Sequence, residues 1–288
     1  MRGLNHQLKQ LCRNNRDGSY GTQARRDREL TLLANQLHAA GYRGMGSHSL
    51  KPKHVQALVE FWLSTRVAIG TIKNRMSALR WWARKVDRQN VVARSNDHYG
   101  IPNRQFVTGE SKARSVSDAD LERITDPHVR MSLELQRVFG LRREEAIKFS
   151  PSYADKGDQL ELKASWTKGG KARSIPIRSP LQRAVLDRAH HLVGKGSLIP
   201  SDRNYRQQLR IYEGQTIRAG LSRMHGLRHA YAQRRYEELT GCVSPAAGGP
   251  ASKSLPPDQR RLDRAARLTI SRELGHERQQ IAATYLDR

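Results

Sequence analysis

The chain ends in LGHERQQIAATYLDR, which places a histidine, His276, nine positions before a tyrosine, Tyr285. A phenol can act as a nucleophile, and an imidazole beside it can exchange a proton or donate a hydrogen bond. A structural explanation is equally simple, because an aromatic side chain near the end of a chain can cover the edge of a core. The other polar residues must decide between these two interpretations.

Further candidates, most of them cationic, stand in short motifs upstream. They are Arg142 and Glu145 in GLRREE, Lys168 in TKGGKAR, and His225, Arg228 and His229 in HGLRH. One reaction uses such a set, namely the attack of a tyrosine oxygen on a phosphodiester. Its transition state gains negative charge on the non-bridging oxygens, which two arginines can clamp and a histidine can hydrogen-bond. A lysine can protonate the departing 5′ oxygen.

Other chemistries fit the sequence less well. His225 and His229 have the spacing of a helical zinc motif, but Gly226 stands where that motif requires a glutamate. There is no Gly-x-Ser-x-Gly elbow and no phosphate-binding Gly-x4-Gly-Lys loop. The two cysteines, Cys12 and Cys242, form neither a disulfide framework nor a cysteine zinc site. We therefore expect no metal and no cofactor.

The charge of the chain indicates its partner. Lys and Arg number 52 against 27 Asp and Glu, a formal net charge of +25. An excess of this size favours a polyphosphate partner, so nucleic acid is expected. No apolar run is long enough to span a bilayer, and no membrane partner is expected. The low cysteine content fits a reducing cytoplasm.

The first part of the chain is predicted to be a helical bundle over residues 21–90, preceded by an extension over 1–20. Apolar residues recur at helical spacing in TQARRDRELTLLANQLHAAG, KPKHVQALVEFWLSTR and TIKNRMSALRWWARKV. Cations of the third segment are candidates for DNA contact: Lys73, Arg75, Arg80 and Arg84. The alternative is that they are solvated helix faces. Residues 91–116, rich in Gly, Pro, Asn and Ser, are predicted to be a linker.

The second part, residues 117–288, is predicted to be mixed. SDADLERI, HVRMSLELQRVFG and LRREEAIKF have helical patterns, whereas QLELKASWTKGGKARSIPI alternates around Gly169-Gly170 and predicts a β-hairpin. Lys171 and Arg173 of this hairpin are further candidates for DNA contact. The chain after Pro180 is predicted to be mostly helical, apart from a loop at 241–257 that is either a tolerated surface loop or an insertion reaching DNA or another protomer. The fold class is therefore mainly α with a small β-sheet.

GLRREE, TKGGKAR, HGLRH and LGHERQQIAATY, in this order, resemble the motifs of the tyrosine recombinases, or phage-type integrases. The resemblance implies a SAM-like helical core-binding domain followed by an α+β catalytic domain. It implies that Tyr285 is the nucleophile that forms a 3′-phosphotyrosine. The residues implied around the scissile phosphate are Arg142, Lys168, His225, Arg228 and His276, with Glu145 and His229 in supporting positions.

The resemblance also implies partners: double-stranded DNA, a homo-tetramer on two DNA sites and, as a further candidate, a directionality factor, in the bacterial cytoplasm at the nucleoid. It favours the integrase of a mobile element. Two features depart from the family pattern, the long interval between HGLRH and LGH and the short tail after Tyr285, which precludes the usual exchange of a C-terminal helix. The alternatives are a non-enzymatic DNA-binding protein derived from a recombinase and a type IB-like topoisomerase.

Overall fold

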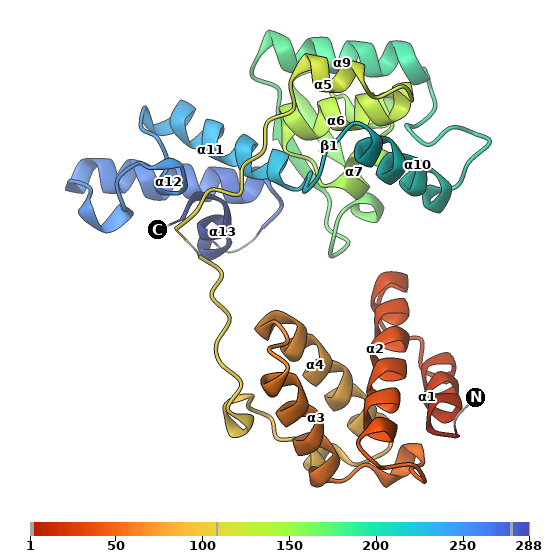
Figure 1. Ribbon diagram of the computed structural model, residues 1–288. Helices are drawn as coiled ribbons and strands as arrows, with labels where there is room; N and C mark the ends of the chain where they lie inside the picture. Colours follow the sequence, from red (N-terminus) through yellow and green to blue (C-terminus); the bar gives the residue numbers. More distant parts are fainter. Residues whose placement is uncertain (1–2, 108, 277–278, 288) are drawn as a thin grey trace. The chain divides into compact units, whose positions relative to one another are not determined.

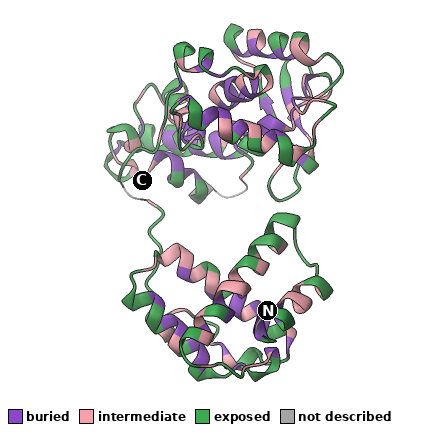
Figure 2. Cartoon of the chain, turned by 45° about the vertical axis from the view of Figure 1, so that its right-hand side comes forward, coloured by how far each residue is buried: buried purple, intermediate pink, exposed green. Residues whose placement is uncertain are grey.

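The computed structural model describes residues 3–107, 109–276 and 279–287, and the chain divides into two compact units, Met1–Gln105 and Phe106–Arg288 (Figure 1). The division falls inside the linker predicted for residues 91–116. The described residues are mostly helical, with one two-stranded antiparallel sheet, which confirms the predicted fold class. Figure 2 shows the buried residues gathered in the interior of each unit.

The first unit consists of helices around one apolar core. Its elements are α1 (Gly3–Asn14), α2 (Tyr20–Ala39), η1 (Ser47–Ser49), α3 (Pro52–Ser64), α4 (Ile69–Lys85), η2 (Gln89–Val91) and η3 (Asp97–Tyr99). Ser19 begins α2 because its hydroxyl accepts the N–H of Thr22, and Pro52 stands at the first turn of α3. Trp62 and Trp82 are fully buried at the centre of the core.

The boundaries of this unit differ from the predicted ones. The predicted extension 1–20, of which residues 1–2 lie outside the described residues, contains α1. Leu4 and Leu8 of α1 are buried in the core of the first unit. Val92 and Ile101, which belong to the predicted linker, are buried in the same core. Apolar contacts therefore extend the unit on both sides of the predicted bundle.

The second unit begins with helices that lead into the hairpin. Its first elements are α5 (Asp118–Glu122), α6 (Pro127–Phe139), α7 (Arg143–Ile147), α8 (Pro151–Ala154), β1 (Gln159–Leu162), η4 (Ala164–Trp166) and β2 (Arg173–Pro176). The strands pair antiparallel with Leu160 opposite Ile175 and Leu162 opposite Arg173, so the predicted β-hairpin is confirmed. Leu160, Leu162 and Ile175 are fully buried against α6 and α9 (Pro180–Val193).

The rest of the second unit is helical. Its elements are α10 (Tyr205–Arg218), α11 (Gly226–Thr240), η5 (Pro245–Ala247), η6 (Ser252–Ser254), α12 (Pro257–Glu273), η7 (Gln279–Ala282) and α13 (Ala283–Leu286). Helices α11 and α12 lie side by side, with α13 against them (Figure 1). The predicted loop 241–257 contains η5 and η6, and η5 packs on α13.

Gly140 sets the geometry at the end of α6. It closes the helix in the left-handed region, at φ 63° and ψ 26°, which glycine adopts without strain. A Cβ atom at this position would stand 2.6 Å from Cδ1 of Tyr231 on α11. Gly140 thus lets α6 end and α11 approach closely at the same point.

We predict that Gly140→Ala lowers the free energy of unfolding by about 2 kcal/mol, because both the positive φ and the Tyr231 ring oppose a side chain. Gly157→Ala is the matched control, since Gly157 also has a positive φ, 86°, but nothing stands within 4 Å of an added Cβ. The control should lose about 1 kcal/mol. Urea unfolding measures both values, and equal losses would contradict a role for the Tyr231 ring.

Candidate active site

Arg142 and Glu145 meet at the start of α7. Arg142 is the N-cap residue, and the Glu145 carboxylate accepts its backbone N–H at 2.7 Å. The same carboxylate accepts Nη1 of Arg142 at 2.7 Å. These contacts between residues three apart at the start of α7 fix the Arg142 side chain beside the turn that follows α6.

Arg228 lies at the centre of the site, on the first turn of α11. Its side chain is only 1% exposed. Nη1 donates to the carbonyl of Gly140 at 2.6 Å, Nη2 donates to the carbonyl of Leu274, and Nε donates to the hydroxyl of Tyr285 at 3.2 Å. Burial, with the charges of Arg142 and Arg173, lowers the pKa of Arg228 to about 10, so it remains a cation at neutral pH.

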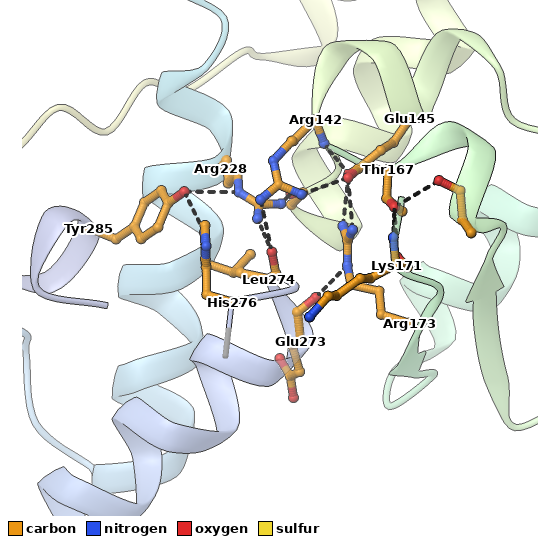
Figure 3. A network of polar contacts seen from close by, with 12 residues as sticks. Arg142, Glu145, Thr167, Lys171, Arg173, Arg228, Glu273, Leu274, His276 and Tyr285 are labelled. Atoms are coloured by element: carbon orange, nitrogen blue, oxygen red, sulfur yellow. Dashed lines mark hydrogen bonds and ion pairs between the residues drawn. The ribbon is translucent and has the colours of Figure 1, made fainter. Parts of the chain in front are cut away.

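The C-terminal end of α12 supplies acceptors to three guanidiniums. The carbonyl of Leu274 accepts Nη2 of Arg142 at 3.3 Å as well as Nη2 of Arg228. The carbonyl of Glu273 accepts Nε of Arg173 at 3.0 Å. Carbonyls at this end of a helix lack intrahelical partners and carry the negative end of the helix dipole, so they suit cations. Figure 3 shows the three arginines converging on this turn.

Arg173 does not occupy the exposed hairpin position predicted for a DNA contact. Its side chain is 7% exposed, and Nη1 and Nη2 donate to the two oxygens of Glu145, each at 2.7 Å. A buried carboxylate in a distant segment explains the difference, because it offers a bidentate partner. Burial alone would raise the pKa of Glu145, but its bonds to Arg173 and the charges of Arg228 and Arg142 hold the pKa at about 2.

The hydroxyl of Tyr285 faces these cations although its side chain is only 5% exposed. Nε2 of His276 lies 3.2 Å from the hydroxyl oxygen, which thus contacts both His276 and Nε of Arg228 (Figure 3). The ring of His229 packs against the ring of Tyr285, with 4.7 Å between centroids, and the ring of His225 lies at 6.3 Å. Both interpretations of Tyr285 therefore apply in part, since the ring fills a core and the hydroxyl points into a polar site.

The three histidines are surrounded by cations. Burial, followed by the charges of Arg228 and Arg142, lowers the pKa of His276 to about 4. Burial and neighbouring His225 lower the pKa of His229 to about 4, and burial with Arg228 lowers the pKa of His225. At neutral pH these rings are uncharged, so each offers one donor and one acceptor nitrogen.

The tip of the hairpin presents two lysines. Thr167 closes the tip, because its hydroxyl donates to the carbonyl of Lys171 at 2.6 Å and accepts the backbone N–H of Lys171 at 3.1 Å. Lys168 and Lys171 are both exposed. The charge of Lys168 acts on the site, since it contributes to the lowered pKa values of His225 and His276.

The cations predicted to bind DNA in the first unit divide into two groups. Arg80 donates to the carbonyl of Ala93 at 3.0 Å and to the side chain of Asn96 at 2.8 Å, and Arg75 pairs with Glu29 at 3.6 Å. Arg84 is exposed, and Lys73 is half-buried beside Asn103. Arg84 is thus better placed for a partner than the other three, which are half-buried and have partners within the unit.

Within the described ranges, no group of three His, Cys, Asp or Glu side chains is arranged to hold a metal ion. Likewise, no helix among the described residues is long and apolar enough to cross a membrane. Residues 277–278 of the terminal motif lie outside the described residues.

Arg173 is the site residue that the sequence interpretation misplaced, and the pattern contained a signal for it. Side chains alternate between the two faces of a strand, so Arg173 shares a face with Ile175. Ile175 is fully buried, as is Leu162 opposite Arg173. The backbone carbonyls of Gly140, Glu273 and Leu274 left no signal in residue types, because any residue supplies a carbonyl.

Comparisons with known proteins agree with this geometry. A family profile described as "Integrase" matches residues 106–234, and one described as "Phage integrase, N-terminal" matches residues 1–92. No curated protein matches the chain significantly.

Several solved structures are similar over almost the whole chain. A lambda integrase tetramer bound to a Holliday junction is 16% identical, with a TM-score of 0.61, covering 98% of this chain and 76% of that one. XerH recombinase in a post-cleavage complex with palindromic difH is 16% identical, at 0.61, covering 98% and 80%. The Tn1549 transposon integrase with circular intermediate DNA is 12% identical, at 0.57, covering 100% and 96%. At these identities the likeness establishes the fold.

The fold and the family profiles together define a class, the DNA-cleaving and rejoining enzymes that use a tyrosine. The chain belongs to the integrase family of tyrosine recombinases, which are site-specific DNA recombinases. The resemblance drawn from the four motifs is thereby confirmed.

We predict a loss of stability in mild acid that depends on His229. Its pKa is about 4 in the folded chain against an ordinary 6.5, so the unfolded chain binds the proton first as the pH falls below 6.5. This contribution to stability is complete above pH 6.5 and is lost toward pH 4. Between about pH 7 and pH 5, His229 should account for about 1–2 kcal/mol of unfolding free energy. Urea unfolding of His229→Asn should show a flatter pH dependence, and an unchanged one would contradict the burial effect.

Proposed function

We propose that the chain cuts one DNA strand with the hydroxyl of Tyr285 and rejoins it to another, using Arg142, Arg228, His225, His276 and Lys168 around the phosphate. The observation that carries the proposal is the position of the Tyr285 hydroxyl, 3.2 Å from Nε of Arg228 and 3.2 Å from Nε2 of His276. Tyr285, Arg228 and His276 lie together in one catalytic unit, which supports cleavage by the residues of a single chain.

The first step forms a bond between the phenolic oxygen and phosphorus and breaks the bond to the 5′ oxygen. In the tautomer whose Nε2 lone pair faces Tyr285, neutral His276 accepts the phenolic proton. Arg142 and Arg228 stabilise the charge that grows on the non-bridging oxygens. Lys168, on the exposed hairpin tip, protonates the departing 5′ oxygen.

The second step is the reverse reaction with a different strand. A free 5′ hydroxyl attacks the phosphotyrosine and returns its proton to Lys168, while His276 returns a proton to the departing tyrosine oxygen. The phosphodiester energy is retained in the covalent intermediate, so the balance requires no nucleotide cofactor. Glu145 orients Arg142, and His229 packs on the Tyr285 ring in support of both steps.

The assembly we propose is a homo-tetramer on two double-stranded DNA sites, which the lambda integrase tetramer on a Holliday junction supports by analogy of fold. The Tn1549 transposon integrase supports a role in moving a mobile element. Such a reaction takes place on the bacterial chromosome, in the cytoplasm, where a directionality factor can bias it toward integration or excision.

We predict that Tyr285→Phe abolishes covalent attachment to DNA while binding stays within about three-fold, because the change removes only the nucleophilic oxygen. The substrate is a nicked duplex from the ends of the element that encodes the chain, and the adduct is detected by denaturing gel. Tyr153→Phe is the control, since Tyr153 packs against Trp166 in the same unit. An undiminished adduct in the Tyr285→Phe variant would contradict the assignment of Tyr285 as the nucleophile. Relaxation of any supercoiled plasmid, without a site, would instead indicate a topoisomerase.

DNA binding should weaken steeply with salt, because cations in both units neutralise phosphates. For Arg84→Ala, whose side chain is exposed, we predict a log–log salt slope that is shallower by about 0.9 for each phosphate that the variant no longer neutralises. Arg75→Ala and Arg80→Ala should leave the slope unchanged, since their side chains bond within the unit. Fluorescence anisotropy over a salt series measures the slopes, and the opposite ranking would refute this division of the four residues.

A further inference from the structure

We propose that Arg173 is a positioning residue for DNA cleavage. It donates to both oxygens of Glu145, and this keeps the donors of Arg142 available to the phosphate. This inference rests on the proposed function. It assigns Arg173 to the interior of the site, where its partners are a carboxylate and a helix end.

The side chain of Arg173 is fixed at each nitrogen. Nη1 and Nη2 donate to the two oxygens of Glu145 at 2.7 Å, and Nε donates to the carbonyl of Glu273 at 3.0 Å. Gly275 packs closely against the aliphatic part of the Arg173 side chain, since a Cβ atom at Gly275 would stand 2.8 Å from Cδ of Arg173. Only 7% of the side chain is exposed, so direct contact with a DNA backbone is restricted.

Glu145 divides its two oxygens between two arginines. Oε1 accepts Nη1 of Arg142 and Nη1 of Arg173, and Oε2 accepts the backbone N–H of Arg142 and Nη2 of Arg173. The bidentate geometry thus belongs to Arg173, whereas Glu145 binds the Arg142 side chain through Nη1 alone. A carboxylate and a single guanidinium frequently pair through two parallel hydrogen bonds. Without Arg173, Glu145 would take Arg142 in that way and turn its donors away from the phosphate.

Charge leads to the same conclusion. Glu145 is fully buried and ionised, with a pKa of about 2. With Arg173 present, three cations surround this single anion, which leaves an excess of two positive charges for a phosphate whose negative charge grows during the reaction. Loss of Arg173 would halve that excess and remove the two hydrogen bonds that it donates to the buried carboxylate beside Arg142.

The test is a double-mutant cycle on the rate of adduct formation at saturating nicked DNA. Arg173→Met should slow cleavage about 100-fold, the order of loss caused by misplacing a catalytic group, with DNA binding within about three-fold. If Arg173 acts through Glu145, then Arg173→Met combined with Glu145→Gln cleaves no slower than the slower single variant. Independent roles instead predict the product of the two losses.

Two further variants keep the test decisive. Arg173→Lys retains the charge but not the bidentate geometry, so it should fall between the wild type and Arg173→Met, and it carries the same cycle if the Met variant unfolds. Arg183→Met is the matched control, because Arg183 of α9 also pairs with a carboxylate, that of Asp155 at 2.7 Å. This variant should cleave DNA at the normal rate. Thermal unfolding checks that each variant is folded.

The outcomes separate this inference from the function beneath it. Absence of an adduct with the unaltered chain would contradict the proposed function and the inference with it. An adduct that forms at the normal rate in the Arg173→Met variant, or losses that multiply in the cycle, would overturn the inference alone.

Discussion

The candidate active site depends on one buried carboxylate and one helix end that together hold three guanidiniums. Two like charges about 4 Å apart repel by about 4 kcal/mol at an effective dielectric constant of 20, so such a cluster does not form without fixed acceptors. Glu145 accepts from Arg142 and Arg173, and the last carbonyls of α12 accept from all three arginines. These bonds tie together the end of α6, the hairpin, α11 and α12, four segments that are distant in sequence.

Much of this architecture could be predicted because its causes are local. Apolar spacing predicted the helices of the first unit, and alternation around Gly169-Gly170 predicted the hairpin. The ordered motifs predicted which polar residues share a function, and the structure brings Arg142, Arg228, His276 and Tyr285 into one hydrogen-bonded cluster. The roles of these side chains remain predictions that the adduct experiments address.

Other features could not be predicted because their causes are distant. Strand alternation indicates a buried face for Arg173, but nothing local indicates its partner, because Glu145 lies 28 positions earlier. Helix α1 is polar overall, and the burial of Leu4 and Leu8 depends on the helices that follow. The segment 241–257 lacks periodicity, yet its backbone closes short turns, such as the bond from Gly249 N–H to the Ser244 carbonyl at 2.9 Å.

The hydroxyl of Tyr285 has a consequence for the enzyme before DNA arrives. A buried guanidinium with an unfilled donor is costly, and a phosphate oxygen is absent until substrate binds. The phenol accepts from that donor on Arg228, and in the proposed mechanism it gives up this place to a phosphate oxygen when DNA binds. Substrate entry is then an exchange of one acceptor for another, and the cation cluster can be assembled in advance at little energetic penalty.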